Sequence, residues 1–191
     1  GIVGVLGAGP WIVRSSCRME DGATHSNAGV FLSIPNVEMD ELEAAVGQVV
    51  ASYGEAQPTD EVLIQPMLTQ VVRSGVAFSH NPNSCAPYRV VNWSEGSDTA
   101  AVTGGMGGRL WQQAAQSVVP PTPTFAGVVT LLDELLVLFG DVPVDCEFAV
   151  TREEDSEVLW LLQARPLILA NTPETPEVQA GRLQRIQDKI S

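Results

Sequence analysis

A carboxylate, a carboxamide and a guanidinium are predicted to lie close together near the C-terminal end of this chain. If a hairpin turn is centred on Asp155, Glu147 lies directly opposite Gln163 on the paired strand, and Arg165 follows two residues later on the same face. The two side-chain oxygens can hold a hard cation, and the guanidinium can bind the phosphate that the cation neutralises. From spacing alone, an ordinary cross-strand pair between Glu147 and Arg165 is the alternative, and such a pair contributes little stability.

The predicted hairpin follows from the alternation of residue types along two segments. Residues 144–151 (VDCEFAVT) place Asp145 and Glu147 on one face and apolar side chains on the other. A second strand is predicted at 158–162, and the acidic segment 152–157 is typical of the turn between them.

Arg14 is a second residue that could bind phosphate. It follows the short apolar run 11–13 and precedes two serines, so it lies at the end of a predicted buried strand. A guanidinium in that position can bind two phosphate oxygens at once. A surface arginine at the end of a strand is the alternative interpretation.

The overall composition argues against several classes of partner. The 191 residues include 23 acidic and 10 basic side chains, so the formal net charge is −13. Nucleic acids and anionic membranes select basic surfaces, so neither is an expected partner. The apolar fraction of 45% is typical of a globular chain, and no apolar run is long enough to span a bilayer. The 3 cysteines are widely spaced and form no CxxC pair, which predicts reduced thiols in a cytoplasmic protein.

The elements that would position these residues form an α+β pattern. Strands are predicted at 11–13, 28–34, 62–68, 75–79, 88–93, 144–151 and 158–162, and helices at 39–53, 125–139 and 177–190. We expect Asn36 to be the N-cap of the first helix and Gly140 to end the second. Pro66 predicts an edge strand or a bulge. Because most of the strands are linked as hairpins, a mostly antiparallel sheet with flanking helices is expected.

A set of short segments carries a resemblance to a known family. They occur in the order VRSS (13–16), ED (20–21), AG (28–29), IQPM (64–67), SGVAF (74–78), NP (81–82), DCEFA (145–149) and LLQARP (161–166). In this order they resemble the nucleotide-binding domain of phosphoenolpyruvate synthase and pyruvate phosphate dikinase, which has an ATP-grasp fold. SNAGVFLSI, PYRVVNW and TAAVTGG also resemble the branch that includes a capsule L-glutamine kinase. The resemblance covers residues 11–169, with a glycine-rich start at 1–10 and a linker and helix at 170–191.

The resemblance implies roles for particular residues of this chain. It implies that Arg14 contacts the phosphates of ATP, that Glu147 and Gln163 bind Mg²⁺, and that Arg165 stabilises the transferring phosphoryl group. The strand and linker beside the adenine would be Gln65, Pro66 and Met67. In this family, ATP phosphorylates a histidine on a separate swivelling domain, which passes the phosphoryl group to a small molecule.

Two features of the family are missing from this sequence. The family has a phosphate-binding lysine in a subdomain that precedes VRSS, whereas Lys189 is the only lysine here. The phospho-histidine motif is also missing, and we expect His25 and His80 to be solvated and without a catalytic role. The chain is therefore expected to be part of an ATP-grasp unit. Without its partners, the swivelling domain and the lysine-bearing subdomain, it should bind ATP weakly and be inactive.

Three other functions stay open at this stage. The chain could be a nucleotide-sensing or interaction module on a degenerate ATP-grasp scaffold. It could be a carboxylate–amine ligase, although the LLQARP segment argues against this. It could also be a structural α+β domain in which Glu147, Gln163 and Arg165 are an ordinary hairpin surface. The acceptor, whether pyruvate, glutamine or another small molecule, is not indicated by these residues.

Overall fold

The chain forms an α+β fold with mostly antiparallel sheets, as the sequence predicts. The computed structural model describes residues 3–16, 21–22, 25–26, 32–54, 57–96, 108–154 and 156–190. The chain divides into two units, Gly1–Thr69 and Gln70–Ser191. The boundary falls inside the segment 11–169, which the resemblance treats as part of one domain.

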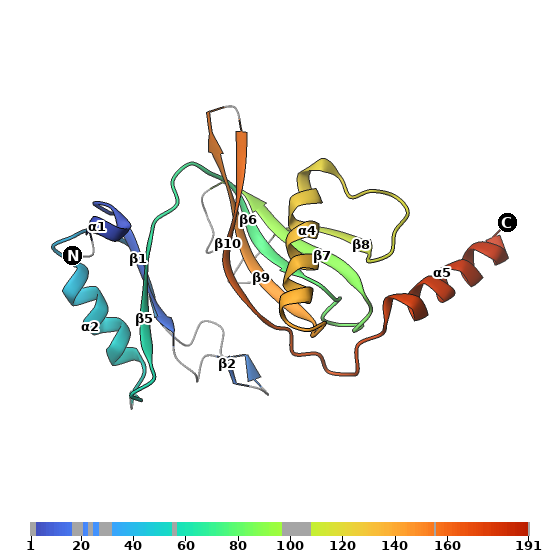
Figure 1. The fold of residues 1–191 in the computed structure, drawn as a ribbon, viewed down its shortest axis with the longest axis horizontal. Coiled ribbons are helices and arrows are strands. Elements are labelled where there is room, and N and C mark those ends of the chain that lie inside the picture. Colours follow the sequence, from blue (N-terminus) through green and yellow to red (C-terminus); the bar gives the residue numbers. More distant parts are fainter. Residues whose placement is uncertain are drawn as a thin grey trace. The chain divides into compact units, whose positions relative to one another are not determined.

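The first unit is a three-stranded antiparallel sheet with a helix packed on one face (Figure 1). The strand order is β4–β1–β5, so the strand that ends in Pro66 is at an edge, as predicted. The elements are α1 (Val3–Leu6), β1 (Trp11–Ser16), the short pair β2 (Asp21–Gly22) and β3 (His25–Ser26), β4 (Ser33–Val37), α2 (Leu42–Ser52) and β5 (Glu61–Pro66). The buried apolar core consists of Val13, Val37, Ala45, Val49 and Tyr53.

The predicted N-cap of the first helix is wrong. Asn36 lies in β4 with a left-handed φ of 57°, which asparagine tolerates better than most residues. The next residue, Val37, pairs with Trp11 in the sheet, so this segment cannot also start a helix. The helix α2 begins at Leu42, after a turn in which the Glu41 N–H donates to the Glu38 carbonyl.

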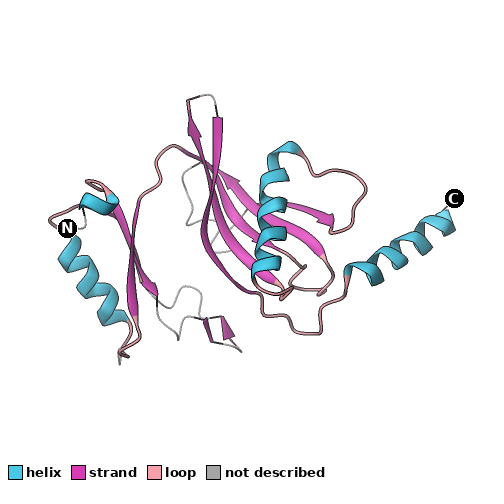
Figure 2. Ribbon diagram, in the orientation of Figure 1, coloured by secondary structure: helices cyan, strands magenta, loops and turns pink. Residues whose placement is uncertain are grey.

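The second unit is a five-stranded antiparallel sheet with the order β10–β9–β6–β7–β8 (Figure 2). The helix α4 lies across one face of this sheet. The elements are β6 (Val71–Phe78), β7 (Tyr88–Glu95), β8 (Arg109–Ala114), α4 (Pro123–Leu138), β9 (Val144–Glu153), β10 (Ser156–Pro166) and α5 (Pro176–Ile190). Gly140, with a φ of 65°, follows the end of α4 as predicted. No helix in the described part of the chain is long and apolar enough to cross a membrane.

The core of this unit lies between α4 and the sheet. The helix contributes Phe125, Val128, Leu132 and Leu135, and the sheet contributes Ala77, Val91, Val144, Cys146, Phe148 and Val150. A Cβ atom on Gly75 would lie 2.3 Å from the Asn92 carbonyl oxygen, so only glycine allows β6 and β7 to approach this closely. The missing side chain at Gly75 leaves room for Trp93. The Trp93 ring packs edge-on against Phe125, with 5.4 Å between the ring centroids.

The strand β8 was not predicted from the sequence. Trp111 is its one side chain packed against the core, and its ring lies 5.1 Å from that of Phe125. Leu110 is exposed, and two glutamines follow Trp111. An edge strand with a single core contact lacks the apolar alternation that identifies strands in a sequence.

Replacing Leu132 with alanine should destabilise the second unit substantially. Its side chain is 0% exposed at the centre of the α4 contact, and deleting such a leucine typically costs about 2–5 kcal/mol. Leu138→Ala is the matched control on the same helix, because Leu138 is 79% exposed and should change stability by less than about 0.5 kcal/mol. Urea unfolding of both variants checks this prediction, and equal effects would contradict the packing of α4 described above.

Candidate functional site

The register of the β9–β10 hairpin sets Glu147 directly opposite Gln163, which confirms the predicted pairing. From the turn outward, the strands pair regularly until Leu161, which lies opposite Phe148. The register then shifts by one residue, so that Gln163 pairs with Glu147 and Arg165 with Asp145. A β-bulge at Leu162 accounts for the shift, since two residues of one strand there oppose one residue of the other.

The sequence predicts this pairing from a turn centred on Asp155, whereas in the structure the bulge at Leu162 produces it. The regular register near the turn, continued without a bulge, would set Leu162 opposite Glu147 and Gln163 opposite Cys146. Because side chains alternate between faces, Gln163 and Arg165 would then face α4. The bulge restores the pairing that a turn centred on Asp155 would have given.

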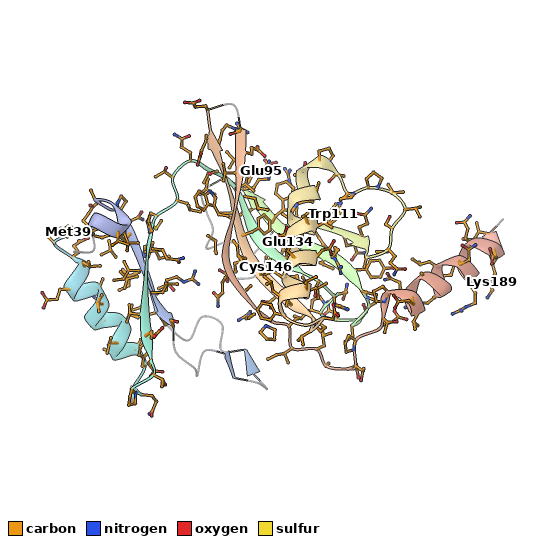
Figure 3. The ribbon with its side chains drawn as sticks, in the orientation of Figure 1. Met39, Glu95, Trp111, Glu134, Cys146 and Lys189 are labelled. Atoms are coloured by element: carbon orange, nitrogen blue, oxygen red, sulfur yellow. The ribbon has the colours of Figure 1, made fainter. Side chains whose placement is uncertain are left out.

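Four polar side chains therefore share the sheet face that is turned away from α4. They are Asp145, Glu147, Gln163 and Arg165. Their neighbours along the strands, Cys146 and Ala164, contact the core on the α4 side, where Figure 3 labels Cys146. Glu147 and Gln163 are both half-buried. One face of the hairpin thus packs into the core, and the other face carries the polar cluster.

Asp145 and Arg165 form an ion pair across the two strands. The Nε–H of Arg165 donates to Oδ1 of Asp145, with a nitrogen–oxygen distance of 2.8 Å. Asp145 is 8% exposed, so the contact is shielded from solvent. The residue types and their spacing had suggested no role for Asp145. The spacing could have indicated one, because in an antiparallel pair with Glu147 opposite Gln163, the residue opposite Arg165 is Asp145.

The carboxylates of Asp145 and Glu147 also raise the pKa of the Cys146 thiol, which lies between them in the sequence. The pKa of Cys146 is raised to about 12, mainly by burial and then by the negative charge of Asp145, while a backbone hydrogen bond at Ala77 lowers it and Glu147 contributes a smaller increase. The thiol is therefore protonated at neutral pH and is a core side chain, not a nucleophile.

The donor set on this face fits Mg²⁺ in the company of a phosphorylated ligand. Magnesium ions are usually held by one or two carboxylates, together with waters and substrate phosphates. Glu147 and Gln163 offer two side-chain oxygens from adjacent strands, and directly opposite residues have Cβ atoms about 5 Å apart. Within the described residues, no group of three or more His, Cys, Asp or Glu side chains could hold a metal ion. A cation here would complete its coordination with ligand oxygens and water.

In the first unit, Arg14 and Gln65 share one face of the sheet. Arg14 pairs with Leu63, and Gln65 pairs with Ile12 on the neighbouring strand. This face is turned away from α2, because the alternate residues Trp11 and Val13 are the buried ones.

The resemblance also assigns Pro66 and Met67 to the adenine, and these two residues lie at the end of β5. Pro66 lies opposite Trp11. The Met67 N–H donates to the Pro10 carbonyl at 3.0 Å, which fixes the end of the strand. The structure thus brings Arg14 and Gln65 to one face of the first unit, and Glu147, Gln163 and Arg165 to one face of the second.

His80 is buried, not solvated, and the sequence prediction for it is wrong. It is 7% exposed, and its Nδ1 lies 3.1 Å from the Ser79 hydroxyl, which also accepts a hydrogen bond from the Val144 N–H. In the turn that follows, the Asn81 N–H donates to the Ala86 carbonyl. Burial and the nearby Arg89 charge lower the pKa of His80. The side chain of His25 lies outside the described residues.

Two other arginines take part in ion pairs at the surface of the sheet. Arg73 contacts Glu157. Arg109 contacts Glu95 at 2.9 Å and lies over the Trp93 ring at 5.3 Å. Neither belongs to the polar cluster on the hairpin, so both provide controls for it.

No family model matches this chain, and no curated protein sequence matches it significantly. Function is therefore inferred from the residues and their geometry. Glu20, the segment 28–29 and the segment TAAVTGG (99–105) lie outside the described residues.

Substituting His80 should change how stability depends on pH. Its folded pKa lies below the unfolded value of 6.5, so below that pH the unfolded chain binds a proton that the folded chain resists. This group therefore lowers stability as the pH falls through 6.5. When the pH falls from about 7.5 to about 5.5, the free energy of unfolding should decrease by up to about 1.4 kcal/mol more in wild type than in His80→Asn. Urea unfolding of wild type and His80→Asn at both pH values measures the difference. Equal pH dependence in wild type and His80→Asn would contradict this account.

Proposed function

We propose that this chain binds Mg·ATP and positions its phosphates for phosphoryl transfer. In this proposal it is the nucleotide-binding part of a phosphotransferase of the phosphoenolpyruvate synthase and pyruvate phosphate dikinase type, with an ATP-grasp fold. The phosphoryl group would pass through a histidine on a separate domain to a small molecule such as pyruvate or L-glutamine. The observation that carries the proposal is the hairpin register, which sets Glu147 against Gln163 and Arg165 against Asp145 on one face.

Glu147 and Gln163 are the proposed Mg²⁺ ligands. Their two oxygens come from adjacent strands whose other face is fixed by the core, so their separation does not depend on a loop. When bound, the cation neutralises charge on the phosphates and helps to orient them.

Arg165 is the proposed contact for the transferring phosphoryl group. In phosphoryl transfer, most of the catalytic effect comes from positioning and from stabilising the charge that spreads over the equatorial oxygens. A guanidinium binds such oxygens through directional N–H groups and keeps its charge at any physiological pH. Arg165 is two residues from the proposed metal ligand Gln163 on the same face, so Arg165 and the bound cation would contact one polyphosphate chain.

The first unit would contribute to nucleotide binding through Arg14 and the end of β5. Arg14 would bind phosphate oxygens, and Gln65, Pro66 and Met67 would lie beside the adenine. β5 is an edge strand of its sheet, and edge strands present backbone N–H and C=O groups of the kind that recognise a base edge. This supports the assignment of β5 to the adenine.

Glu147→Ala should remove most of the Mg²⁺ dependence of ATP binding while the fold is kept. The substitution removes the only charged member of the proposed ligand pair, so the cation would lose its strongest protein contact. Because affinity of about a millimolar is expected, chemical-shift titration with ATP in the presence and absence of Mg²⁺ is the suitable measurement.

Glu153→Ala is the control for this variant, because Glu153 is an exposed acidic residue of the same strand. It should leave the Mg²⁺ dependence unchanged. An unaltered Mg²⁺ dependence in Glu147→Ala would refute the metal assignment.

Arg14→Ala and Arg165→Ala should each weaken ATP binding more than substitution of any other arginine. Each removes a charge-assisted hydrogen bond to phosphate, for which about 1.5–3 kcal/mol is typical. Arg73→Ala and Arg109→Ala should have little effect, since these side chains pair with Glu157 and Glu95. The same titration across the four variants tests this. Equal losses in all four would indicate diffuse electrostatic attraction in place of a defined site.

A further inference from the structure

We propose that Asp145 is a positioning residue that orients the guanidinium of Arg165 for phosphate binding. The proposal rests on the function proposed above for the same hairpin face. It assigns no contact between Asp145 and the nucleotide. Asp145 would act only through Arg165.

The geometry of the ion pair supports an orienting role. The contact runs through Nε of Arg165, the nitrogen closest to the side-chain stem, with a distance of 2.8 Å to Oδ1 of Asp145. A hydrogen bond at Nε restrains the rotation of the guanidinium plane, and the remaining N–H groups of the fork then have fixed directions. Because Asp145 is 8% exposed, water competes poorly for this bond.

The ion pair also opposes a shift of the strand register. The bulge at Leu162 sets the face on which Gln163 and Arg165 lie. A bulge that moved along β10 past Arg165 would set Arg165 opposite Val144, facing α4. Such a shift would break the pair with Asp145 and would also bury a guanidinium against the core, which is costly without a partner.

A purely electrostatic role for Asp145 has the opposite consequence for binding. A carboxylate beside a phosphate site repels the ligand, so a substitution that only removed its charge would strengthen ATP binding. A positioning role predicts weaker binding when the acceptor for Nε–H is lost. The direction of the change therefore separates the two roles.

Two substitutions of similar size test the proposal. Asp145→Asn removes the charge but keeps an oxygen that accepts the Nε–H bond, whereas Asp145→Leu removes both. We expect Asp145→Leu to weaken Mg·ATP binding by about tenfold and Asp145→Asn by less than about threefold. Binding of AMP, which lacks the transferred phosphates, should not change in either variant. Glu95→Leu is the matched control, because it breaks the exposed Arg109 pair on the same sheet.

A second measurement follows Arg165 without any nucleotide. In ¹H–¹⁵N spectra of the full chain, the Nε–H signal of Arg165 should exchange with water several-fold faster in Asp145→Leu than in wild type, and at an intermediate rate in Asp145→Asn. Stronger ATP binding in both variants, equal weakening in both, or an unchanged exchange rate in Asp145→Leu would each overturn the proposal.

The two measurements also separate this proposal from the proposed function. Absence of Mg·ATP binding by the wild-type chain would refute the proposed function, while the exchange rate alone would still decide whether Asp145 orients Arg165. If Asp145→Leu does not fold, the double variant Asp145→Arg with Arg165→Asp replaces it. This variant restores an ion pair but places the guanidinium on β9, so Mg·ATP binding should stay weak. Wild-type affinity in the double variant would overturn the proposal.

Discussion

The polar cluster on the hairpin depends on one constraint, the single-residue shift in register at Leu162. Side chains alternate between the two faces of a strand, so one extra residue moves every later side chain of β10 to the opposite face. Gln163 and Arg165 consequently lie beside Glu147 and Asp145. Without the shift, an amide and a guanidinium would face the apolar core under α4, where they would lose hydration without gaining partners. The apolar core and the polar cluster therefore impose the same register.

The strand β9 links the stability of the second unit to its proposed chemistry. Val144, Cys146, Phe148 and Val150 pack under α4, while the residues between them face the other side. Since β9 is flanked by β6 and β10, its backbone is fixed on both edges. Side chains on such a strand have less freedom than side chains on a loop, which suits a site in which small displacements of a ligand are costly.

Much of this arrangement follows from the sequence, and the failures have physical reasons. Alternation in residues 144–151 predicts both faces of β9, because the apolar positions there are unbroken. The bulge was missed, since the neighbouring leucines of β10 give no local signal for it. His80 is expected in solvent because it lies between a predicted strand and Asn81-Pro82, and its burial depends on tertiary packing that these neighbours do not indicate. Asn36 has the side chain of a helix cap, but pairing of β4 with β1 determines its conformation.

The strong negative charge of the chain bears on what its proposed phosphate-binding residues can do. A net charge of −13 repels a polyphosphate at long range, and at physiological ionic strength that repulsion is screened beyond about 8 Å. Binding therefore depends on local contacts. In the hairpin cluster, Arg165 lies on the same face as the two carboxylates of Asp145 and Glu147. In the proposed function, a divalent cation bound by Glu147 would add positive charge at this face, and it would reduce the charge of the nucleotide at the same time. In the proposed function, charge is therefore the reason why an acidic face would bind a metal–nucleotide ligand, and why a carboxylate and an arginine would contribute to binding the same phosphate.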